Sequence, residues 1–316
     1  MKDNEILLNS SINFPCGNTF SVRHYVETSQ GSQNIMLNRV LIGSIHLGIS
    51  SFFLITQILV FYVSFFYKEY HYKSFKGLHH IKNNGDNMPF TIMKHQGFTS
   101  FIQQICHFIT SILTIVLGDF DSFTESYIGA LLLSSYSTNV VFVFLLTLNR
   151  VDIMYQKIYF IDISRETFFK SGIFICYIIM GIFLILFLLP PFRLIYNPTI
   201  LEWVFFAPSN STVIASIVQS RIIWVLLFFT LILNLLIFFK IISLRRLSIR
   251  RSYFAFEDFK LILHVILCYA SIVFLELCWN GLVGNIYKST VGALIPQIIF
   301  IITSGANAIF TLCFVG

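Results

Sequence analysis

The chain of 316 residues is 56% hydrophobic and only 11% charged, with a mean hydropathy of +0.78 and a formal net charge of +6. Soluble domains carry about 25% charged residues, so this composition excludes an ordinary soluble protein and indicates a membrane protein in contact with the lipid bilayer. The placement of the positive charge matters more than its sum, and we predict no nucleic-acid partner.

Seven apolar segments follow one another along the chain, each long enough to cross a bilayer core that needs about 20 apolar residues. We predict transmembrane helices at about 40–66, 97–117, 127–148, 171–190, 221–242, 259–283 and 291–314. The fold class is therefore an all-α membrane protein, a bundle of seven transmembrane helices. Residues 1–39 are expected to form an extracellular N-terminal segment, and residues 40–316 a single seven-transmembrane domain.

The distribution of basic residues predicts the orientation. Fifteen of the 21 Lys and Arg residues lie in or beside the connections after the odd-numbered spans, with five, four and six in turn. Because Lys and Arg favour the cytoplasmic side, we predict an outside N-terminus and a very short cytoplasmic C-terminus. Asn9 and Asn210 begin the sequons Asn-Ser-Ser and Asn-Ser-Thr, and both would then lie outside as glycosylation acceptors.

The third span is unusually polar. It contains the run Ser134–Asn139 and ends at Asn149 and Arg150, with Asp152 two residues on. Polar groups at membrane depth must find partners on neighbouring helices or face a cavity. Arg150 is then either an ordinary basic residue at a helix end, or a switch residue that contacts a neighbouring helix at rest and a partner protein when active.

Three motifs resemble those of G-protein-coupled receptors. Asn149-Arg150-Val151 stands where rhodopsin-like receptors have Asp/Glu-Arg-Tyr, and Asn307-Ala308-Ile309-Phe310 stands where they have Asn-Pro-x-x-Tyr. Cys278-Trp279 resembles the start of Cys-Trp-x-Pro, although Gly281 occupies the proline position.

The wider pattern is similar to the nematode serpentine chemoreceptors of class T or class X. Met88-Pro89-Phe90-Thr91-Ile92-Met93, followed by Gly97, resembles the segment entering their second span. The resemblance implies a receptor in the plasma membrane, for example of sensory-neuron cilia, with a small-molecule ligand and a heterotrimeric G protein as partners. It implies a coupling surface that includes Asn149, Arg150, Arg245, Arg246, Arg250 and Arg251, and a switch at Asn307 and Phe310.

Two departures separate this chain from rhodopsin-like receptors. No cysteine lies near Tyr127 or within residues 191–219, so their usual extracellular disulfide is missing. Arg150 has no acidic residue directly before it, so a resting-state lock on Arg150 would need another partner.

Glu276 is the one carboxylate within a predicted span. The predicted orientation places it roughly 10 Å from the outer boundary, at about 1.5 Å per residue, and the cost of a charge in lipid turns it toward the bundle interior. It is either a hydrogen-bonded structural residue or a pocket group that selects a donor or cation on a ligand. In the second case Ser135, Tyr136 and Trp279 would complete the ligand-binding site.

The remaining polar residues give little support for other kinds of chemistry. His46, His107 and His264 are each alone in their spans, so we expect helix–helix hydrogen bonds rather than a metal site. The sequence shows no nucleophile–base pair, phosphate loop or HExxH motif, so we predict no enzyme activity and no cofactor. The alternatives to a signalling receptor are a seven-span transporter or channel subunit, and a receptor-like protein that no longer couples.

Overall fold

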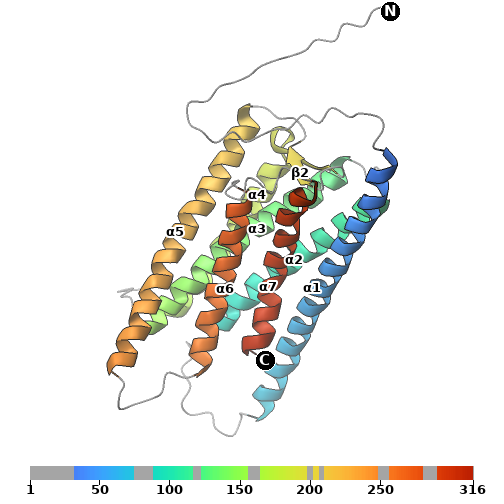
Figure 1. Cartoon of the computed structure of the whole chain (residues 1–316). Coiled ribbons are helices and arrows are strands. Elements are labelled where there is room, and N and C mark those ends of the chain that lie inside the picture. The colour runs from blue at the N-terminus through green and yellow to red at the C-terminus, as the bar shows by residue number, and fades with distance from the viewer. Residues whose placement is uncertain are drawn as a thin grey trace, which may run out of the picture.

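The structure, a computed structural model, describes residues 32–74, 88–116, 122–155, 164–197, 202–205, 210–247, 256–279 and 290–315. Its long helices run side by side as one bundle (Figure 1). They are α1 (Ser32–Ser74), α2 (Met88–Val116), α3 (Ser122–Met154), α4 (Arg165–Leu188), α5 (Asn210–Leu247), α6 (Phe256–Trp279) and α7 (Thr290–Val315). Within the described residues seven helices are long and apolar enough to cross a membrane, which confirms the predicted bundle.

Several helices extend beyond the predicted spans. Helix α2 already begins at Met88 and α5 at Asn210, although both starts were predicted to lie in polar connections. In α2 the added turns bury Gln96 against neighbouring helices. A hydropathy profile detects the apolar part of a helix. It therefore underestimates the length of a helix whose polar side chains face the bundle interior.

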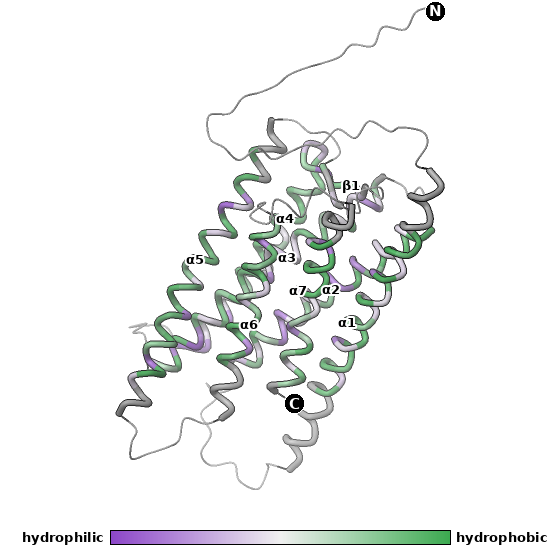
Figure 2. Tube along the Cα trace, viewed as in Figure 1, coloured by the Kyte–Doolittle hydropathy of each residue, from purple (hydrophilic) through white to green (hydrophobic). Residues whose placement is uncertain are grey.

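Helix α3 is the centre of the bundle and α4 lies at its edge. In the most apolar 18-residue stretch of α3, 72% of the residues are buried inside the protein, compared with 17% in the corresponding stretch of α4. Figure 2 shows hydrophobic residues along most of every helix, interrupted by short hydrophilic stretches. A polar stretch in the central α3 can therefore meet other helices, whereas the apolar surface of α4 suits contact with lipid.

The segment between the predicted spans 171–190 and 221–242 contains regular structure. A 3₁₀ turn at Pro190–Phe192 leads into an antiparallel hairpin of β1 (Leu194–Asn197) and β2 (Glu202–Phe205). In its register Leu194 lies opposite Phe205, and Tyr196 lies opposite Trp203. The hairpin sits at the end of the bundle where α4 ends and α5 begins, opposite the C-terminal end of α7 (Figure 1).

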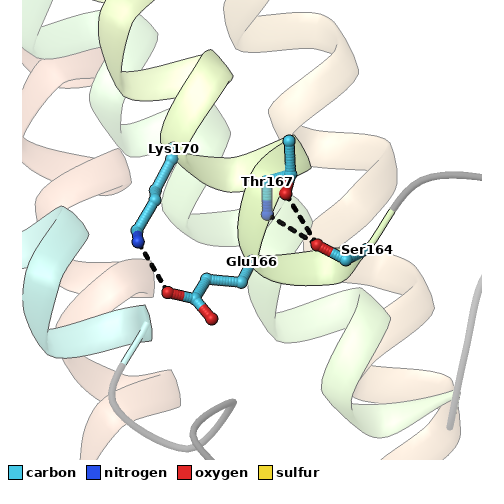
Figure 3. Close-up of polar contacts among 4 residues, drawn as sticks. All are labelled: Ser164, Glu166, Thr167 and Lys170. Carbon is cyan, nitrogen blue, oxygen red and sulfur yellow. Dashed lines mark hydrogen bonds and ion pairs between the residues drawn. The ribbon is translucent and has the colours of Figure 1, made fainter.

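The start of α4 shows why the helix begins at Arg165. The Ser164 hydroxyl accepts a hydrogen bond from the Thr167 backbone N–H at 3.2 Å, which caps the first turn (Figure 3). One turn further on, Lys170 Nζ lies 2.6 Å from Glu166 Oε1. This ion pair is largely exposed, so we expect it to contribute little to stability.

Close contacts hold α7 against α1 and α2. The Phe53 ring of α1 lies directly over Gly305 of α7, where a side chain on residue 305 would collide with it. From α2, the Gln104 amide nitrogen donates to the Ile301 carbonyl at 3.0 Å and to the Ser304 hydroxyl. Small residues that let helices approach and polar groups that bond across them are typical of membrane bundles.

Candidate functional site

A buried hydrogen bond joins α3 to α6 in the half of the bundle nearer the hairpin. The Tyr136 hydroxyl donates to Glu276 Oε1 at 2.7 Å, and both side chains are at least 98% buried. A carboxyl group inside a membrane is tolerated when it is hydrogen-bonded and faces other helices. The prediction that Glu276 faces the bundle interior is therefore confirmed, while its role in ligand binding stays a prediction.

The Tyr136 ring forms an aromatic cluster with two other rings. The ring of Trp279, one turn after Glu276 on α6, lies 5.2 Å from that of Tyr136. The ring of Phe300, from α7, lies 5.3 Å from Tyr136 and 5.0 Å from Trp279, and all three pairs meet edge to face. Such pairs add about 0.5–1.5 kcal/mol each beyond the area they bury. The site therefore joins α3, α6 and α7 in one cluster.

Ser135 directly precedes Tyr136 in the sequence and is also buried, but its hydroxyl has a different hydrogen-bond partner. Its hydroxyl donates to the Leu131 carbonyl of its own helix at 2.6 Å. The structure thus brings Tyr136, Glu276 and Trp279 together, whereas the hydroxyl proton of Ser135 is used within α3. A hydroxyl retains acceptor capacity, so a ligand donor could still bind to Ser135.

The hairpin is fixed to the nearby ends of α2 and α3 by side-chain contacts. The Tyr196 hydroxyl lies 2.7 Å from Thr114 Oγ1 of α2, and Arg193 Nε donates to Ser126 Oγ of α3. Trp203 packs over Gly129 of α3. These contacts fix the hairpin although the cysteines of the usual extracellular disulfide are missing.

Gly129→Leu should detach the hairpin. A Cβ atom at residue 129 would lie 2.7 Å from Trp203 Cε3 and 3.0 Å from Leu194 Cβ, so one of these side chains has to move. We expect a loss of about 1–3 kcal/mol, measured as a lower thermal unfolding temperature of the purified protein. Gly181→Leu is the matched control, because nothing lies within 4 Å of that site and stability should be unchanged. Equal effects of the two substitutions would refute the close packing.

The opposite end of α3 buries the residues predicted to couple to a G protein. Asn149 is completely buried and Arg150 is 97% buried. Both amide atoms of Asn149 lack a hydrogen-bond partner within the described part of the chain. In this arrangement another protein could reach Arg150 only after a neighbouring helix had moved.

Helices α6 and α7 are joined beside Arg150. His264 Nε2 lies 3.1 Å from Asn307 Oδ1, and the His264 ring meets Phe310 edge to face at 6.3 Å. Arg150 lies close enough for its charge to act on His264. The predicted switch residues Asn307 and Phe310 thus share one contact on α6, and the predicted helix–helix hydrogen bond of His264 is confirmed.

Three further contacts lie at the same end of α3. Arg165 Nε, at the start of α4, lies 2.7 Å from Asp152 Oδ2. The Tyr155 hydroxyl donates to the Leu236 carbonyl of α5 at 3.1 Å, with Lys240 Nζ 5.1 Å from the centre of its ring. The acidic residue near Arg150 therefore pairs with α4.

Some predicted residues have no described side chain. Asn9, Arg250 and Arg251 lie outside the described residues. Asn210, Arg245 and Arg246 belong to α5, but only their helical backbone is described. The predictions for glycosylation and for the arginine run accordingly stay predictions.

The sequence did not single out Phe300 or the pairing of two histidines. The rings of His46 on α1 and His107 on α2 lie 6.1 Å apart, and His107 meets Phe300 edge to face at 4.7 Å. The prediction that His107 forms a helix–helix hydrogen bond is wrong, because neither ring nitrogen has a partner within the described residues. No group of three or more His, Cys, Asp or Glu in the described segments is placed to hold a metal ion.

The seven long apolar helices define a multi-pass membrane protein with a seven-transmembrane bundle. The sequence model of the serpentine type 7TM GPCR chemoreceptor Srx family matches residues 74–255, which is more than half of the chain. The chain belongs to this family, which is a family of receptors rather than enzymes. No curated protein matches it.

Proposed function

We propose that this chain is a chemosensory receptor of the plasma membrane, which binds a small external molecule between α3, α6 and α7 and signals to a heterotrimeric G protein. Membership of a chemoreceptor family supports a receptor function. The observation that carries the proposed site is the buried hydrogen bond between Tyr136 and Glu276, which joins two helices inside an aromatic cluster.

The ligand we propose carries a hydrogen-bond donor, such as an ammonium group. Such a group would compete with the Tyr136 hydroxyl for the Glu276 carboxylate, and Trp279 and Phe300 would cover its apolar part. Because the present hydrogen bond holds α3 to α6, its replacement favours an arrangement in which α6 has moved. A ligand shifts the population only if it binds that arrangement more tightly.

Movement of α6 would change the cytoplasmic end of the bundle. The His264–Asn307 contact holds α6 to α7 next to the buried Arg150. Breaking this contact would expose the guanidinium group, whose five donors suit the carbonyl groups at the end of a partner helix. Asn149, Arg150 and the arginines at 245, 246, 250 and 251 are then the proposed coupling surface.

The proposed orientation has an outside N-terminus and cytoplasmic connections at 67–96, 149–170 and 243–258. The excess of Lys and Arg on that side supports this topology. Glycosylation acceptors inserted one at a time should be modified in residues 1–39 and near Asn210, and should stay unmodified in residues 67–96, 149–170 and 243–258. Modification of an acceptor placed near Gly85 or Ser248 would reverse the topology and remove the outer position of Glu276.

Nucleotide exchange tests the function as a whole. The purified chain in lipid nanodiscs is mixed with a panel of heterotrimeric G proteins and screened with small molecules, including amines. We expect at least one compound to accelerate GDP release on at least one G protein. If compounds bind without exchange on any G protein, the chain is a receptor-like protein that no longer couples.

A further inference from the structure

Three side chains on α1 and α2 form a polar group that the proposed mechanism does not use. His46, Gln103 and His107 are each at least 95% buried. Within the described residues, both ring nitrogens of His107, both amide atoms of Gln103 and Nε2 of His46 have no hydrogen-bond partner. Buried polar groups in native proteins are almost always hydrogen-bonded, so these five atoms are suited to a bound molecule that supplies their partners.

This polar group adjoins the aromatic cluster. The His107 ring lies 4.7 Å from Phe300, whose ring lies 5.3 Å from Tyr136. The rings of His107 and Tyr136 are therefore at most 10.0 Å apart, the sum of those two distances. Gln103 precedes His107 by four residues and shares its face of α2. One small molecule could reach both polar groups across Phe300.

The chemistry of the three side chains limits what they would bind. None of them is a carboxylate or a permanent cation, so a charged ligand group here would lack an opposite charge at membrane depth. A neutral imidazole has one donor and one acceptor, and an amide has both kinds of atom. A hydroxyl group, which both donates and accepts, matches this set.

We propose that His107, together with His46 and Gln103, forms a second polar subsite of the ligand site and binds a neutral hydroxyl group of the ligand. The inference rests on the proposed receptor function and deepens it. The ligand is then a compact molecule with a hydroxyl at the His107 subsite, an apolar body against Phe300 and a donor at Glu276.

Three matched probes test the subsite separately from the function. Toluene, benzyl alcohol and benzylamine share one ring and differ in one group. Their binding to the full chain in nanodiscs is measured by saturation-transfer NMR, and comparison with variants removes partitioning into lipid. Benzyl alcohol should bind at least about 3-fold more tightly than toluene. This preference should disappear in His107→Leu and in the nearly isosteric Gln103→Met, and persist in Glu276→Gln.

Benzylamine reports on the proposed function instead. Its binding should be weakened by Glu276→Gln and retained in His107→Leu. If benzyl alcohol binds no better than toluene while benzylamine depends on Glu276, a bound water explains the His107 group and the subsite is overturned. If benzylamine binding is independent of Glu276, the proposed ligand site fails, whatever the alcohol does.

Stability provides a control on the variants. His95 of α2 has a partner, since its Nδ1 lies 2.9 Å from the Tyr177 hydroxyl and its ring stacks on Phe142. His95→Leu should lower the thermal unfolding temperature by at least about 2 °C, whereas His107→Leu should leave it unchanged or raise it. A loss in His107→Leu as large as that in His95→Leu would make His107 a structural residue and overturn the subsite.

Discussion

Arg150→Ala should reduce ligand-driven nucleotide exchange to the rate seen without receptor, while surface expression and ligand binding persist. The guanidinium group is buried at the end of α3 opposite the hairpin, beside the contact between α6 and α7. Its proposed task begins only after α6 moves, so its loss removes the active contact without affecting the outer site.

Lys170→Ala is the matched control for this substitution. It also removes a basic side chain close to the same end of the bundle, but Lys170 is exposed and pairs with Glu166 on the same helix (Figure 3). Exchange should be unchanged in this variant. Survival of exchange in Arg150→Ala would show that the role implied by the receptor motif does not apply to this chain.

Glu276→Gln should weaken binding of a cationic ligand by roughly 10- to 150-fold, which corresponds to about 1.5–3 kcal/mol for a charge-assisted hydrogen bond. The fold should be retained, because the glutamine carbonyl can still accept the Tyr136 hydroxyl. Equilibrium binding to equal amounts of purified wild type and variant measures the change.

Glu276→Leu and Tyr136→Phe separate binding from structure. Leucine leaves the buried Tyr136 hydroxyl without its acceptor, which should lower stability by about 1–3 kcal/mol. Phe at position 136 removes the competing hydroxyl and keeps the aromatic cluster, so binding should be equal or tighter. If Glu276→Gln and Tyr136→Phe both bind ligand like the wild type, Glu276 is only structural.

The sequence predicted the bundle and the inward direction of Glu276 because both follow from the cost of polar groups in lipid. Span length and hydropathy located the helices, and a carboxyl group at depth had to meet another helix. Tyr136 could be named because its depth on α3 matches that of Glu276 on α6.

Contacts between segments far apart in the chain were not predictable in this way. Phe300 is one of 36 phenylalanines, and nothing in its local sequence distinguishes the one that touches Tyr136, Trp279 and His107. The pairing of His46 with His107 depends on how α1 and α2 are rotated against each other. The hairpin was missed because β1 and β2 have four residues each, too few for an alternating pattern to stand out.

The measurement closest to the central claim is the movement of α6 on ligand binding. Spin labels at the half-exposed Glu166 on α4 and the exposed Ile266 on α6, in a chain with Cys16 and Cys313 replaced by serine, report this distance by double electron–electron resonance. Saturating ligand with a G protein should change the distance by more than about 2 Å, and the change should be lost in Glu276→Gln at the same ligand concentration. An unchanged distance with ligand bound and nucleotide exchange under way would contradict the account.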